Sequence, residues 1–203
     1  MAELLDRTGP SRPPAPASDS THADDSRTPP VVVPPARAEV RILQAVQGAA
    51  GTPPVVAVAR GMSLFGEHAA GWLAIGAAGA LLDRGRRREW LTATAGVALA
   101  HGASIGVKRV VRRPRPTDER VRVLVGTPSA LSFPSAHATS TTAAAVLFGA
   151  LLRRPAVAAV VPPMALSRLV LGVHYPTDVL VGSALGAAVG LLTRRLAGRK
   201  ARR

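Results

Sequence analysis

The 203-residue sequence has no cysteine, few aromatic residues and fewer than half as many acidic as basic residues. Without cysteine the chain forms no disulfide or zinc finger and uses no thiol nucleophile. Phe, Trp and Tyr make up only 3% of the residues, which leaves little material for stacking nucleic-acid bases. Its formal net charge of +14 and its 47% hydrophobic residues are together typical of a membrane protein with basic helix ends. We therefore expect the membrane, and no nucleic acid, as a partner.

The composition changes at both ends of the chain. Residues 1–37 are rich in Pro, Ser and Ala, and the polar, acidic start is not followed by the apolar segment of a secretory signal. Such a segment buries too little apolar surface to offset its ordering entropy, so we predict a disordered tail. Residues 38–196 are the predicted folded domain, and residues 197–203 a basic C-terminal tail.

Five apolar segments with charges confined to their ends follow two short segments at 40–47 and 55–65. The five lie at 68–82, 90–107, 136–152, 155–173 and 179–193. Each is near the lower limit of the ~17–25 residues that span a bilayer, so a soluble bundle is the alternative. Five such segments in succession, closed mostly by Arg, favour the membrane. The sequence predicts an all-α fold, a polytopic membrane helical bundle.

The basic loops predict the orientation of this bundle. The loop at 84–88, the pair at 153–154 and the chain from 194 to 203 alternate with the other loops and hold 12 Lys and Arg, against 8 on the opposite face. The face with more positive charge is expected in the cytoplasm. The other face, which carries the polar clusters described next, is then extracytoplasmic.

Three polar clusters lie at the ends of the apolar segments on that second face. They are Lys108 to Arg115-Pro116, then Pro134-Ser135-Ala136-His137, then Ser167-Arg168 with His174 to Asp178. Taken singly, the first could be an ordinary basic loop and His137 a histidine at a helix end. Arg168 is harder to dismiss, because an Arg near the centre of a membrane helix costs ~2.5–3.5 kcal/mol. It needs a partner or a polar cavity.

Together the clusters have the donors that a phosphate ester requires. The planar guanidinium groups of Arg115 and Arg168 can each bind two oxygens, and Lys108 supplies a compact positive charge. Ser135 follows a proline at a predicted helix start. Its hydroxyl and the free backbone N–H of Ala136 would point at an anion, assisted by the helix dipole.

Two histidines can share the chemistry of phosphate transfer. One imidazole must be neutral to attack phosphorus, and the other must be protonated to release the alkoxide. Asp178, four residues after His174, can accept its Nδ1 proton and leave Nε2 free to attack. His137 remains as general acid. No cluster of Asp, Glu or Cys indicates a metal, so we expect catalysis through a phosphohistidine without metal or other cofactor.

The same residues resemble the three motifs of the type 2 phosphatidic acid phosphatase (PAP2) superfamily. The motifs are Lys108-x6-Arg115-Pro116, Pro134-Ser135-Ala136-His137 and Ser167-Arg168-x5-His174-x3-Asp178. One position departs from the family pattern, which usually has Gly where this chain has Ala136; alanine keeps the backbone N–H and narrows the pocket. The resemblance implies a helical bundle with the active site at the helix mouths, a phosphohistidine and no metal.

The superfamily covers several activities, among which the apolar segments argue against soluble acid phosphatases and vanadium haloperoxidases. Gly66-Glu67-His68 followed by Gly71-Trp72-Leu73 resembles the actinobacterial decaprenyl-phosphoryl-phosphoribose phosphatases of cell-wall arabinan synthesis. Glu67 and His68 are alternatively a polar pair at a helix mouth. The prediction is a membrane phosphatase of a lipid phosphate or polyprenyl phosphate. Alternatives are a polyprenyl-diphosphate, phosphatidate or phosphatidylglycerophosphate phosphatase, or a non-catalytic basic protein that binds nucleic acid or anionic lipid.

Overall fold

The computed structural model describes residues 37–200, which form helices and connecting loops without a strand. In order, the elements are α1 (Arg37–Ala50), α2 (Pro53–Gly66), η1 (Glu67–Ala69), α3 (Ala70–Leu82), η2 (Arg84–Arg86), α4 (Arg87–Val111), α5 (Ala136–Leu151), η3 (Pro155–Val160), α6 (Val161–Val170) and α7 (Pro176–Lys200). The predicted all-α fold is confirmed. The predicted disordered tail lies outside the described residues except for Arg37, and helix α7 continues through residues 197–200.

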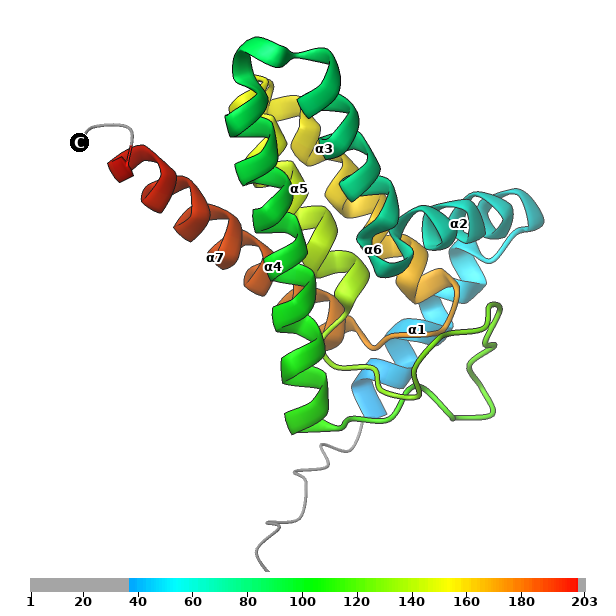
Figure 1. The fold of residues 1–203 in the computed structure, drawn as a ribbon. Helices are drawn as coiled ribbons and strands as arrows, with labels where there is room; N and C mark the ends of the chain where they lie inside the picture. The colour runs from blue at the N-terminus through cyan, green and yellow to red at the C-terminus, as the bar shows by residue number, and fades with distance from the viewer. Residues whose placement is uncertain (1–36, 201–203) are drawn as a thin grey trace, which may run out of the picture.

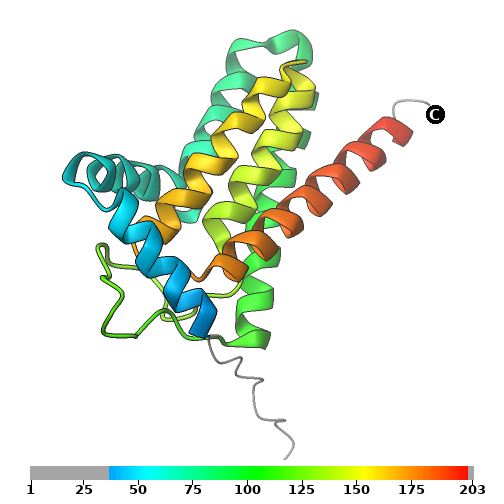
Figure 2. The same ribbon diagram turned by 180° about the vertical axis from the view of Figure 1, so that it is seen from behind.

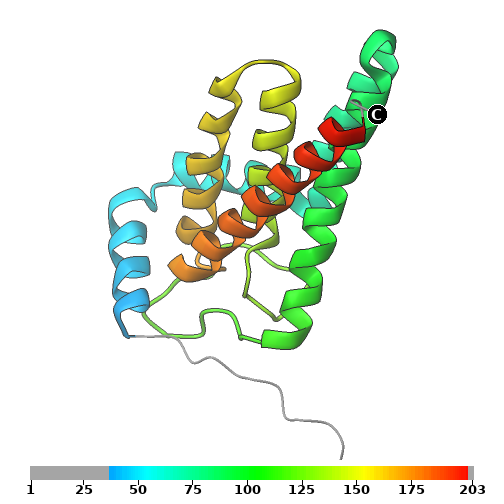
Figure 3. The same cartoon turned by 90° about the vertical axis from the view of Figure 1, so that its left-hand side faces the viewer.

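Helix α5 lies at the centre of the bundle. Helices α3 and α4 pack on one side of it, α6 runs beside it, and α7 crosses it obliquely, as Figures 1 and 2 show. Helix α2 lies across the bundle, and α1 packs against the ends of α6 and α7 (Figure 3). The long connection from α4 to α5 closes the end of the bundle where α6 and α7 meet.

Small residues bring α5 and α7 into close contact. Helix α5 has the sequence AHATSTTAAAVLFGAL, and eleven of its residues are buried. On α7, a Cβ atom placed on Gly182 would lie 2.6 Å from the carbonyl oxygen of Ser135, and one on Gly186 would meet the carbonyl of Thr139. Small residues are the usual means of close helix packing in lipid. This contact sets the first turn of α5 against the first turn of α7.

The outer surface of the bundle is that of a membrane protein. Two helices, Arg84–Val111 and Pro176–Arg199, are long and apolar enough to cross a bilayer, and a third span arises if Arg37–Ala50 and Pro53–Leu82 are counted as one bent pair. Large apolar side chains such as Leu82 (85% exposed) and Leu64 (73% exposed) point outward. The chain is a multi-pass membrane protein, although within residues 37–200 fewer than five helices meet the length and composition of a full span.

One predicted segment is divided in the structure. The apolar run 155–173 was expected to be a single segment, but it begins as η3, continues as α6 and ends at Val170. Pro162 and Pro163 lie in the first turn of α6, where a missing backbone N–H is tolerated. Gly172 has φ +68°, which ends helical geometry. Residues 171–175 consequently form the turn that carries His174.

Candidate active site

The turn between α6 and α7 fixes His174 inside the protein. Gly172 must be glycine here, because its φ is positive and an added Cβ would lie 2.9 Å from Nε2 of Gln47 and clash with the carbonyl of Arg122. Backbone N–H groups of Leu171 and Val173 donate to carbonyls in the last turn of α6. His174 is left only 2% exposed, just before α7 begins.

The two ring nitrogens of His174 face different partners. Nη1 of Arg115 lies 3.3 Å from Nε2, and a guanidinium can only donate, so Nε2 carries the lone pair. The proton is therefore on Nδ1, which lies 3.5 Å from Oδ2 of Asp178. This separation is too long for a hydrogen bond, although catalytic contacts often tighten when substrate binds. The spacing of His174 and Asp178 predicts the same tautomer, and the hydrogen bond from Nδ1 to Asp178 stays a prediction.

Burial and positive charge keep the His174 ring neutral. Burial lowers the pKa of His174 well below its usual value, and the nearby charges of Arg115, Lys108 and Arg168 lower this pKa further. The neutral imidazole is the form that can attack an electrophile. The same three cations surround it, so an anionic group in front of Nε2 would be held where attack is possible.

Backbone carbonyls of the α4–α5 loop hold two of these cations. Nε of Arg115 donates to the carbonyl of Ser129 at 2.7 Å, and Nη1 donates to that of Val173 at 2.6 Å. Nζ of Lys108, at the end of α4, donates to the carbonyls of Leu131 and Ser132 at 3.1 and 3.0 Å. Burial lowers the pKa of Arg115 to about 10, which leaves this guanidinium charged at neutral pH. Neither cation has a carboxylate partner among residues 37–200.

Arg168 is the most deeply buried of the three cations. It lies in the last turn of α6, is 1% exposed, and its Nε and Nη1 have no hydrogen-bond partner among the described residues. A buried charge without a partner is strongly unfavourable. An anion bound between Arg168 and Arg115 would supply the missing acceptors. The partner or polar cavity expected for Arg168 from the sequence therefore stays a prediction.

The first turn of α5 contributes the second predicted cluster. Ser135 is the N-cap of α5; it is fully buried, and its Oγ lies 3.4 Å from the backbone nitrogen of Ala138. Its own N–H donates to the carbonyl of Asp178 at 2.9 Å, which ties α5 to α7. The N–H of Ala136 begins the helix and has no acceptor within the turn.

The His137 ring contacts helix α2. Its Nε2 lies 2.8 Å from the carbonyl oxygen of Ser63, and because a carbonyl only accepts, Nε2 carries a proton. The predicted role as general acid then requires a transferable proton on Nδ1. Among the charged groups nearest to the ring is Arg168, so His137 does border the same site.

Two buried residues that the sequence did not single out hold Asp178 in place. Nη1 of Arg113 donates to Oδ1 of Asp178 at 2.9 Å, and its Nη2 pairs with Glu39 of α1. Glu39 also accepts hydrogen bonds from the hydroxyl and the N–H of Thr177. In the sequence, Arg113 is one of several charges in a basic loop, and Glu39 lies 74 positions before it. No local sequence signal relates them.

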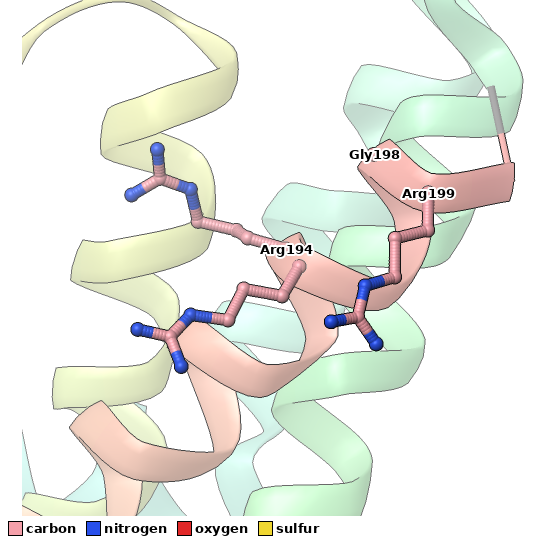
Figure 4. A pocket seen from close by; sticks show the side chains of 4 residues that line it. Arg194, Gly198 and Arg199 are labelled. Carbon is pink, nitrogen blue, oxygen red and sulfur yellow. The ribbon is translucent and has the colours of Figure 1, made fainter. Parts of the chain in front are cut away.

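Two surface hollows lie apart from His174. One, of about 290 Å³, is formed by Arg194, Arg195, Gly198 and Arg199 at the end of α7 (Figure 4). The other, of about 560 Å³, is lined by Arg37, Arg41 and Arg120. Arginines line both hollows, with one glycine in the first, and neither is lined by a nucleophile or a general base. Basic side chains at the ends of membrane helices account for the first.

The chain belongs to the PAP2 superfamily, which its residues 89–202 match. It is 62% identical over 147 residues to a protein of Mycolicibacterium smegmatis named decaprenylphosphoryl-5-phosphoribose phosphatase, a match that covers 72% of this chain and 82% of that protein. A protein of Mycobacterium tuberculosis with the same name is 53% identical over 167 residues, covering 82% of this chain and 94% of the relative. The predicted superfamily is confirmed.

Two solved structures share the fold. A transmembrane PAP2-type phosphatidylglycerolphosphate phosphatase of Bacillus subtilis matches with a TM-score of 0.65 and 22% identity, covering 81% of this chain and 88% of that one. LpxE of Aquifex aeolicus matches with a TM-score of 0.67 and 19% identity, covering 81% and 99%. The chain thus shares its helical arrangement with both proteins, one of which is described as a transmembrane PAP2-type phosphatase.

The first prediction concerns Arg113, which neutralises two buried carboxylates. Arg113→Met would leave Glu39 and Asp178 without their cation and should cost about 3–5 kcal/mol of stability. Arg113→Lys, which keeps the charge but not the planar fork, should lie between this variant and the wild type. Thermal unfolding in detergent measures the difference. The exposed neighbour Arg109 provides the control Arg109→Met, and an equal effect of both Met variants would contradict the assignment.

Proposed function

We propose that this chain hydrolyses the phosphomonoester of a polyprenyl-phosphoryl-5-phosphoribose, releasing inorganic phosphate. The main structural support for a phosphatase is the group of three cations around a neutral His174, the buried Lys108 and Arg168 and the half-buried Arg115, which have no carboxylate partner in residues 37–200. Membership of the PAP2 superfamily supports the same reaction. The names of relatives at 53–62% identity support the phosphoribosyl lipid as substrate.

In the proposed mechanism, Lys108, Arg115 and Arg168 hold the phosphate oxygens, together with Ser135 and the N–H of Ala136. Nε2 of His174 attacks phosphorus and forms the P–N bond of a phosphohistidine. The P–O bond to the sugar breaks, and the alkoxide takes a proton from His137. Water then attacks the phosphohistidine, gives its proton to His137 and releases phosphate. Asp178 stabilises the charge that His174 carries in between.

The second prediction tests this reaction and its substrate together. The purified protein should release phosphate with EDTA present, and His174→Ala should abolish the release because no other group replaces the nucleophile. Wild-type activity in that variant would contradict the mechanism. The substrates are a polyprenyl-phosphoryl-phosphoribose, a polyprenyl diphosphate, phosphatidate and phosphatidylglycerophosphate, and the first should be hydrolysed fastest.

The panel also separates the alternatives. Comparable rates on all four substrates would remove the phosphoribosyl assignment and leave a general lipid-phosphate phosphatase. Absence of any release, together with salt-sensitive binding of DNA or anionic vesicles, would instead support the non-catalytic interpretation of the +14 charge. Loss of activity in EDTA would contradict a metal-independent mechanism.

We further propose that the protein lies in the cell membrane with the active site on the extracytoplasmic face. The loop around Arg84–Arg86, the α5–α6 turn and the end of α7 lie at one end of the bundle, and the α4–α5 loop lies at the other (Figure 1). In the chain that follows α3, 12 Lys and Arg belong to the first end and 8 to the second. This difference supports a cytoplasmic location for the first end.

The third prediction makes use of the absence of cysteine in the chain. A single cysteine introduced by Glu119→Cys, in the exposed α4–α5 loop, should react with a membrane-impermeant maleimide added to intact cells. Gly85→Cys, in the exposed turn at the opposite end, should react only after the cells are lysed. The reverse pattern would place the site in the cytoplasm.

A further inference from the structure

The junction of α2 and α3 has a strained backbone. His68 and Ala69 have φ angles of 50° and 60°, in the left-handed region that residues with a side chain rarely adopt. Two such residues in succession persist only where their surroundings enforce them, and they occur most often at functional sites. Here the surroundings are well defined. Ala69 is fully buried, and Nε1 of Trp72 donates to Oγ1 of Thr141 on α5 at 3.0 Å.

This junction lies against His137, on the side of the site where the leaving group departs. Gly66 packs on the His137 ring so closely that an added Cβ would lie 2.5 Å from Cδ2. The His137 ring also contacts the carbonyl of Ser63, one turn earlier in α2. In phosphoryl transfer the nucleophile and the leaving group lie on opposite sides of phosphorus. With His174 as nucleophile and His137 as acid, the leaving group extends toward this junction.

Three polar side chains lie here among apolar helices. Nδ1 of His68 is 3.9 Å from Oε1 of Glu67, and the rings of His68 and His101 are 6.4 Å apart. His101 projects from α4 two turns before Lys108 and lies within electrostatic range of His137. Its Nδ1 is buried without a hydrogen-bond partner in the described part of the chain, while Glu67 and His68 keep 43% and 70% of their side chains exposed.

These groups match the hydroxyls of a sugar. A carboxylate can accept a hydrogen bond from one of the two free ribose hydroxyls, at C2 and C3, and an imidazole nitrogen can donate to or accept from the other. An ionisable side chain within a membrane bundle is costly, and such residues usually belong to a functional site. His101, whose Nδ1 has no partner in the described part of the chain, is such a residue. We propose that Glu67, His68 and His101 form a subsite for the ribose hydroxyls of the leaving group, an inference that rests on the proposed function.

The fourth prediction tests this subsite with a cycle of enzyme and substrate changes. The substrates are a short-chain polyprenyl-phosphoryl-5-phosphoribose and its 2-deoxy and 3-deoxy analogues. Wild-type protein should show a KM about tenfold higher for one analogue, because a site built around a hydroxyl rejects a substrate without it. Glu67→Gln should raise KM about tenfold for the ribose substrate, with little change in kcat. For the deoxy analogue with the raised KM, Glu67→Gln should cause no further rise in KM, because the variant and the analogue remove the same interaction.

Controls separate the subsite from its surroundings. Glu89→Gln changes an exposed carboxylate at the far end of α4 and should leave every KM unchanged. His101→Gln should also raise KM for the ribose substrate with little change in kcat. If this variant does not fold, the subsite is tested with Glu67→Gln, which changes an exposed residue. Additive increases in KM from Glu67→Gln and from the deoxy analogue, or an unchanged KM in Glu67→Gln, would overturn the subsite. Either result would leave the proposed function standing. A wild-type protein that hydrolyses phosphatidate but not the ribose substrate would overturn the proposed function and the subsite together.

Discussion

Positive charge without a carboxylate to neutralise it is the constraint around which this site is built. Lys108, Arg115 and Arg168 reach into the protein beside His174, and in residues 37–200 none has an acidic partner. The nearest carboxylate, Asp178, is already paired with Arg113. Because a buried charge is costly without a partner, the folded site favours an anion and keeps His174 neutral. Binding and nucleophilicity thus have one electrostatic cause.

The fold holds this unfavourable arrangement together from several directions. Close packing of α5 on α7, through Gly182 and Gly186, brings two helix N-termini side by side. The hydrogen bond from Ser135 to the carbonyl of Asp178 joins them. Helix α1 contributes through Gln47, whose amide bonds the carbonyls of Arg122 and Val170 at 2.6 and 3.0 Å. A helix outside the central bundle therefore supports the loop and turn that carry the proposed catalytic groups.

The sequence allowed the fold class to be predicted and indicated most residues of the candidate site, because both depend on local patterns. Apolar runs ended by Arg indicate membrane helices, and the spacing from His174 to Asp178 places both at one helix start. The pairing of Arg113 with Glu39 could not be predicted, since it depends on the packing of α1 against α7. Nor could the contact of His137 with Ser63, because it needs α2 to lie across the bundle. The turn at Gly172 could not be predicted either, because only the structure shows that its φ is positive.

The proposed mechanism requires that Nε2 of His174 becomes covalently bonded to phosphorus. The most direct measurement is to mix the enzyme with substrate labelled in the terminal phosphate, quench in alkali within one turnover, and locate the label by peptide mass spectrometry. Phosphohistidine on the peptide that contains His174, formed and lost at rates compatible with turnover, is the predicted result. Label on another residue, or phosphate release without any covalent intermediate, would contradict attack by His174.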